Sequence, residues 1–165
     1  MGSGRLFAVA ASDGINTASD LKVVQEILGK QVEVDYLVQP NLKDFATALW
    51  CDRGYHIFIF TGHSSSNQDG TIGWIKINQS ESLTIEEFKN AFGQAINNGL
   101  QLAIFNSCDG LGLADRLSEL KLAQIIVMSE PVPDEVAIEF LEYFLEHQRQ
   151  EAQHHKLVLV SGWGV

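Results

Sequence analysis

Two residues able to perform nucleophilic and acid–base chemistry follow short apolar segments of this sequence. His63 ends the stretch 56–63, and Cys108 lies in the stretch 103–110. Each stretch begins as an apolar run typical of a β-strand and reaches its reactive residue among glycine and serine. Carboxyl ends of parallel strands meet at one edge of a sheet, where ligands and catalytic groups collect. If the two strands are neighbours, the imidazole can act on the thiol.

The surroundings of Cys108 favour a reactive thiol. A cysteine attacks a carbonyl carbon as the thiolate, which needs a base or a nearby positive charge. The N-terminus of the helix predicted at 111–120 supplies partial positive charge, whereas Asp109 disfavours a thiolate unless its carboxylate is paired or points away. Backbone N–H groups at Cys108 and around His63, from Gly62 to Ser64, are predicted to form an oxyanion hole.

Structural roles are the alternative for each of these residues. A single cysteine at a strand end is often a small buried hydrophobic residue, and a single histidine there is often a hydrogen-bonded loop residue. Because both residues occur together at equivalent strand ends, a catalytic role and a structural role are about equally favoured. Cys51 follows an amphipathic helix with no base beside it, so a structural role is predicted, as it is for His56. His147, His154 and His155 lie in a polar segment and are predicted to be inert.

Composition limits the class of protein. The chain has 165 residues, 45% of them hydrophobic, and a formal charge of −10, which argues against nucleic acid and anionic membranes as partners. No apolar run approaches the roughly 20 residues of a membrane span. Two cysteines form no disulfide framework, and no spacing typical of metal ligands occurs, so a reduced, cytoplasmic protein without a metal is predicted. Residues 1–4 resemble a tag or linker, and 5–165 are predicted to form a single domain.

Strands and helices alternate along the sequence. Strands are predicted at 6–11, 32–38, 56–60, 100–105 and 123–128, with 156–160 a candidate sixth. Helices are predicted after Thr17, after Asn41, from the capping box of Thr84 and Glu87, at 111–120, and after Pro131 and Pro133. The alternation predicts an α/β three-layer sandwich with a mainly parallel sheet of about six strands.

Two segments carry more specific predictions. Residues 64–70 form a polar turn cluster, and 72–77 alternate as in a small β-hairpin arm. The last helix is predicted to bury one apolar face. That face consists of Val136, Ala137, Phe140, Leu141, Phe144 and Leu145.

Three motifs give the chain a resemblance to a known family. They are the segments 60–64 (Phe-Thr-Gly-His-Ser), 102–114, which contains Asn-Ser-Cys-Asp-Gly, and 126–134. On these the chain resembles CHAT domains, caspase-like modules of bacterial signalling and defence proteins, and through them the caspase and separase group of cysteine endopeptidases. The resemblance extends from about Leu6 to about Leu145. Caspases also place their histidine about 50 residues before the cysteine.

The resemblance implies a caspase-like fold and a catalytic dyad, with Cys108 as nucleophile and His63 as base. It implies hydrolysis of a polypeptide through an acyl-enzyme, with no metal or organic cofactor. Ser129 replaces an arginine expected in close relatives, and the sequence after residue 150 departs from the family pattern.

The substrate pocket is predicted from the same resemblance. Asp13, Asp109 and Glu130 are expected to line it, with Asp13 accepting a basic side chain as in metacaspase-like relatives. Asp13 is alternatively a turn residue of Ser-Asp-Gly. The arginines are scattered along the sequence, so the cluster that binds an aspartate in caspases is not expected. They are Arg5, Arg53, Arg116 and Arg149.

Three functions remain open. The first is a cysteine endopeptidase acting as a signalling or defence module of a larger protein. The second is a catalytically silent CHAT scaffold that binds a partner protein. The third, a nucleotide-binding or flavodoxin-like receiver, is disfavoured because no glycine-rich phosphate loop follows the first strand. The sequence does not define the oligomeric state.

Overall fold

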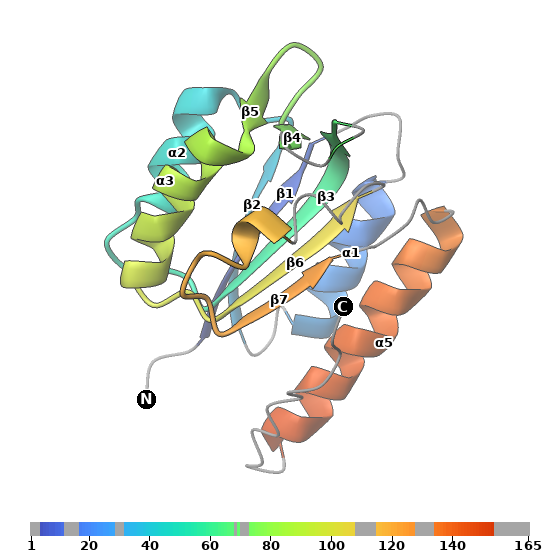
Figure 1. Ribbon diagram of the computed structural model, residues 1–165. Helices are drawn as coiled ribbons and strands as arrows, with labels where there is room; N and C mark the ends of the chain where they lie inside the picture. Colours follow the sequence, from blue (N-terminus) through green and yellow to red (C-terminus); the bar gives the residue numbers. More distant parts are fainter. Residues whose placement is uncertain are drawn as a thin grey trace.

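The computed structural model describes residues 4–11, 17–28, 32–67, 69, 73–107, 115–127 and 134–153. Within these ranges, seven strands form one sheet, with helices on both faces (Figure 1). The elements in chain order are β1 (Gly4–Ala10), α1 (Thr17–Leu28), β2 (Val32–Val38), α2 (Leu42–Leu49), β3 (Ile57–Ser66), β4 (Gly73–Lys76), β5 (Ser82–Thr84), α3 (Ile85–Asn97), β6 (Leu102–Ser107), β7 (Gln124–Val127) and α5 (Asp134–Gln153).

Five strands run parallel in the order β2-β1-β3-β6-β7. Helices α2 and α3 cover one face, and α1 and α5 cover the other (Figure 1). The predicted three-layer α/β fold with a mainly parallel sheet is therefore confirmed. The candidate strand at 156–160 lies outside the described residues, and residues 115–117 of the helix predicted at 111–120 are helical.

The third strand is longer than the sequence predicts. β3 does not end near His63 but continues to Ser66, and its last four residues pair antiparallel with β4. β4 pairs in turn with β5, so the predicted arm exists, but the end of β3 forms its first strand. The composition of the segment 64–70 predicts a turn, whereas the serines at 64–66 belong to β3. Pairing with β4 supplies hydrogen-bond partners that composition does not reveal.

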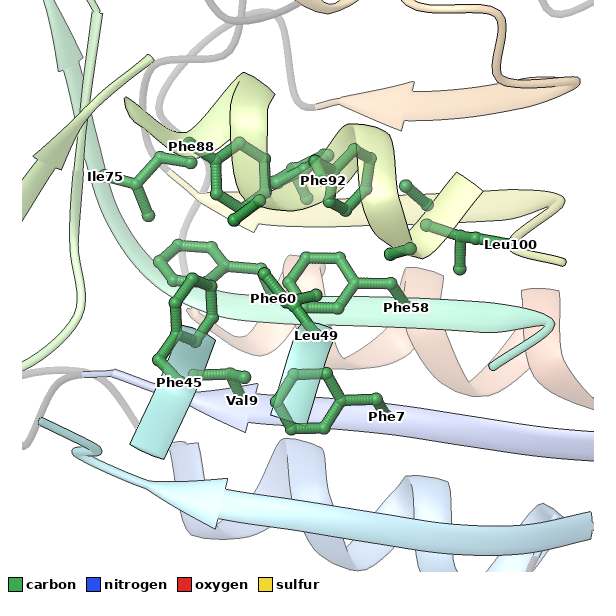
Figure 2. Packing of buried hydrophobic residues seen from close by; sticks show 14 of the residues in the cluster. Phe7, Val9, Phe45, Leu49, Phe58, Phe60, Ile75, Phe88, Phe92 and Leu100 are labelled. Atoms are coloured by element: carbon green, nitrogen blue, oxygen red, sulfur yellow. The ribbon is translucent and has the colours of Figure 1, made fainter. Parts of the chain in front are cut away.

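An aromatic core lies between the sheet and helices α2 and α3. Figure 2 shows Phe58 and Phe60 of β3 facing rings from both helices. The ring of Phe58 lies 5.3 Å from that of Phe92 and 5.6 Å from that of Phe7, measured between centroids. The same ring also contacts Phe45, Phe88 and Phe105. Phe58 is therefore the side chain that joins strands and helices on this face.

The opposite face of the sheet carries a smaller aliphatic core. Ile59 and Ile104 of the sheet pack there with Val24 of α1 and Leu145 of α5. The prediction that α5 buries one long apolar face was wrong near its start, because Val136 is 50% exposed and Phe140 is 36% exposed. Ala137 and Leu141 have no described side-chain environment, Phe144 is partly buried, and Leu145 is 1% exposed.

Local capping fixes where the helices on the aromatic face begin. Asn41 accepts a hydrogen bond from the backbone N–H of Asp44 at 2.8 Å, which starts α2. Thr84 and Glu87 form the predicted capping box at the start of α3. Each cap satisfies backbone N–H groups that the first turn of a helix leaves without partners.

We expect Phe58→Ala to lower the free energy of unfolding by about 3–5 kcal/mol, because it opens a cavity among five other rings. Urea denaturation followed by circular dichroism measures this change. The matched control is Tyr143→Ala, since Tyr143 is 76% exposed; it should change stability by no more than about 0.5 kcal/mol. Equal losses in the two variants would contradict the central position of Phe58.

Candidate functional site

Four polar residues are buried near the carboxyl ends of the two central strands. Thr61 and Ser64 of β3 expose 2% and 9% of their surface, and Asn106 and Ser107 of β6 expose 5% and 4%. Among the described residues, the fifth buried polar or charged side chain, Arg5, lies at the opposite end of the sheet. Buried polar groups require hydrogen-bond partners, so this edge differs in chemistry from the apolar middle of the sheet.

The register of β3 and β6 pairs the residues that directly precede the two members of the predicted dyad in sequence. Thr61 pairs with Asn106, and Gly62 pairs with Ser107. His63 directly follows Gly62, and Cys108 directly follows Ser107. The last pair of this ladder is therefore formed by the two residues that precede the predicted dyad in the chain.

Several predicted site residues lie outside the described residues. They are Asp13, Cys108, Asp109 and Glu130. Their assigned roles remain predictions, while His63, Gly62 and Ser64 have a described environment.

His63 lies where β3 changes partners. Up to Gly62 the strand pairs with β6, and from His63 onward it pairs with β4, with His63 opposite Lys76. Ser64 and its partner Ile75 are buried towards the aromatic core. Since side chains alternate along a strand, His63 and Lys76 face away from that core. His63 is partly exposed, so a ligand on this face has access to the imidazole.

A hydroxyl pair joins β3 and β6 beside the predicted dyad. The Oγ atoms of Ser64 and Ser107 are 2.7 Å apart, and both side chains are buried. The sequence predicted a backbone role for Ser64 in an oxyanion hole and no role for Ser107. The signal for the side-chain role is a serine shortly after the apolar run of each strand, but only the register brings the two together.

Gly62 is a position of close approach. A Cβ atom added there would lie 2.8 Å from the Cβ of Ala11 and 3.1 Å from a ring carbon of Phe60. The glycine therefore lets β3 pass close to the end of β1. Gly62 and Ser64 both belong to paired strand segments. Their backbone N–H groups can serve the predicted oxyanion hole only where they do not already donate to a neighbouring strand.

A second polar cluster surrounds Arg5 at the amino edge of the sheet. The guanidinium donates to Asp35 Oδ2 and to the carbonyl of Gly54, each at 2.8 Å, and lies 4.5 Å from the ring centre of Tyr55. Its Nη1 atom also lies 3.7 Å from the Sγ atom of Cys51. The arginines are thus not all scattered, since Arg5 and Arg53 both contact Glu33.

This cluster changes the acid–base properties of two side chains. The hydrogen bond from Arg5 lowers the pKa of the Cys51 thiol. Burial, together with the hydrogen bond to Asp35, raises the pKa of Tyr55 to about 12. The predicted structural role of His56 fits its position, where Nδ1 accepts a hydrogen bond from the backbone N–H of Arg5 at 3.0 Å.

Metal-site clusters and membrane-spanning helices are absent from the part of the chain that the structure describes. No three histidine, cysteine, aspartate or glutamate residues in it are grouped as a metal site would require. None of its helices combines the length and apolar character needed to cross a membrane.

The architecture and the polar edge define an α/β domain with its candidate site at the carboxyl ends of parallel strands. A family model for the CHAT domain matches residues 8–159. The chain therefore belongs to the CHAT domain family, which is caspase-like. No curated protein matches the chain.

Two solved structures are similar over most of the chain. A flavodoxin-like domain from a Synechococcus protein shares 13% identity at a TM-score of 0.49, with 92% of this chain and 99% of that chain covered. A flavodoxin from the domain Archaea shares 12% identity at a TM-score of 0.41, with 89% and 99% covered. Similarity at this level carries no information on activity.

We expect Gly62→Ala to lower the free energy of unfolding by about 1–3 kcal/mol, because the added methyl group must displace β1 or Phe60. Gly93→Ala is the matched control, since a Cβ atom at this helical position meets nothing within 4 Å. The control should stabilise the protein by about 0.5–1 kcal/mol. Urea denaturation of both variants measures the difference, and equal stability would contradict the close approach at Gly62.

We expect the thiol of Cys51 to be alkylated by iodoacetamide with a pH midpoint below about 8.5, the value of an ordinary cysteine. Arg5 stabilises the thiolate, so the reactive form persists at lower pH. The measurement uses Cys108→Ala protein, so that one thiol reacts. The same protein unfolded in urea is the control and should show the ordinary midpoint; coinciding midpoints would rule out the effect of Arg5.

Proposed function

We propose that this CHAT domain is a cysteine endopeptidase in which Cys108 is the nucleophile and His63 the general base. The observation that carries the proposal is the pairing of Gly62 with Ser107, the residues that directly precede the two members of the dyad. Membership of a caspase-like family supports it. The partly exposed position of His63, on the face turned away from the aromatic core, supports it as well.

The proposed reaction follows from the chemistry of the two side chains. His63 takes the proton of the Cys108 thiol, and the thiolate attacks the carbonyl carbon of the scissile peptide bond. The imidazolium then protonates the leaving amine, which leaves an acyl-enzyme. His63 next removes a proton from a water molecule, whose attack on the acyl carbon releases the acid product and the thiol. The proton of the thiol leaves with the amine product, and His63 passes the proton taken from water to the departing thiolate, so the protons balance without a cofactor.

Substrate binding is assigned to the same edge of the sheet. Asp13 follows β1 in the chain, and β1 is the neighbour of β3 on the side away from β6. We propose that Asp13, with Asp109 and Glu130, accepts a basic side chain of a polypeptide substrate. The acidic net charge of the chain is compatible with a basic substrate segment.

A catalytically silent interaction module is the second candidate. The exposed apolar side chains on α5 favour it, because exposed apolar patches often mark protein contacts. Val136, Phe140 and Tyr143 are 50%, 36% and 76% exposed. This candidate expects binding to a partner protein without turnover of any peptide.

We expect Cys108→Ala to abolish cleavage of a peptide library, because no other group supplies the nucleophile. His63→Ala should lower kcat/KM by about 10²–10⁴-fold, the usual contribution of a general base. Mass spectrometry of the digested library identifies the cleaved bonds, and a fluorogenic peptide built on one of them gives the rates.

Two matched controls remove the same side chains elsewhere. Cys51→Ser changes the cysteine at the amino edge of the sheet, and His147→Ala removes an exposed histidine of α5. Both should retain wild-type rates. Normal cleavage by the Cys108 or His63 variant would exclude the proposed dyad, and an inactive wild-type protein would favour the interaction module.

A further inference from the structure

The hydroxyl pair of Ser64 and Ser107 lies beyond the backbone ladder of the two strands. The last backbone pair of β3 and β6 is Gly62 with Ser107, and Ser64 is two residues further along β3. The two Oγ atoms are 2.7 Å apart, and both serines are buried, with Ser64 exposing 9% of its surface and Ser107 exposing 4%. The pair therefore connects β3 and β6 at the point where β3 turns to its antiparallel partner β4.

Each serine adjoins one member of the proposed dyad. Ser64 directly follows His63, and Ser107 directly precedes Cys108. A hydrogen bond between these serines therefore restrains the two backbones that carry the imidazole and the thiol. Catalysis by two positioned groups is sensitive to displacements near 1 Å, which lower rates by about 10²-fold.

Packing alone does not account for hydroxyl groups at these positions. Burying a hydroxyl group costs free energy unless it is hydrogen-bonded, so each buried serine hydroxyl needs a partner. A bonded pair of buried hydroxyls thus adds a directional restraint that an apolar pair lacks.

We propose that the Ser64–Ser107 hydrogen bond is a positioning element that sets the separation of His63 and Cys108. This inference rests on the proposed endopeptidase function. The two serines act through the backbone of the dyad residues and contact no reacting atom. Their side chains point to the aromatic core, whereas that of His63 points to the other side of the strand.

The test is a double-mutant cycle of Ser64→Ala, Ser107→Ala and the double variant, with urea denaturation and peptide cleavage measured for each. In the double variant kcat should fall about 10²-fold while KM stays within twofold. Urea denaturation checks that the variant is folded under the assay conditions.

A second readout does not depend on turnover. In a Cys51→Ser background, the pH midpoint of Cys108 alkylation should shift in the double variant towards the midpoint of His63→Ala protein. Tyr55→Phe is the matched control, since it removes a buried hydroxyl at the amino edge that donates to Asp35. It should lower the urea midpoint without changing kcat or the alkylation midpoint.

The outcomes separate the two proposals. Wild-type kcat and an unshifted alkylation midpoint in the double variant would overturn the positioning role and leave the endopeptidase intact. A wild-type protein that cleaves nothing, with an alkylation midpoint at Cys108 unaffected by His63→Ala, would overturn the endopeptidase and the positioning role together. Reduced kcat with an unchanged KM and a shifted alkylation midpoint supports both.

Discussion

The pairing of β3 on both of its edges is the constraint on which the rest of the structure depends. β3 lies between β1 and β6 in parallel register, and its middle is buried on both faces. A slip of one residue would turn Phe58 and Phe60 out of the aromatic core and bring their neighbours into it. The core therefore holds the register, and the register determines which residues of β3 and β6 adjoin at the carboxyl edge.

Local signals predicted most of the fold. Asn41 and the Thr84–Glu87 capping box fixed two helix starts, because caps are local hydrogen bonds between residues a few positions apart. The end of β3 was missed because strand formation at Ser64–Ser66 depends on β4, which local composition does not show. The exposure of Val136 was missed because periodicity defines a helix face but not how far the neighbouring layer covers it.

The candidate site was predicted only in part. A reactive side chain after an apolar run is visible in a sequence, so His63 can be singled out, although β3 continues past it; the residue is partly exposed. The contact of Ser64 with Ser107 depends on strand register, and that of Arg5 with Cys51 on the packing of distant segments. In both cases the sequence shows only a polar residue within or directly after an apolar run, which marks a position but not its partner.

The two ends of the central strands have different chemistry. Small neutral hydroxyl and amide groups are buried at the carboxyl end, whereas the charged guanidinium of Arg5 is buried at the amino end, against partly exposed carboxylates. Asp35 is half exposed and can remain hydrated without Arg5, but the buried guanidinium loses its shortest carboxylate contact without Asp35. Divergence at this pair should therefore have a preferred order. In lineages that lost both charges, we expect the arginine to have been replaced before the aspartate or together with it. Related sequences should then include some with the aspartate but no arginine, and few with the arginine but no aspartate.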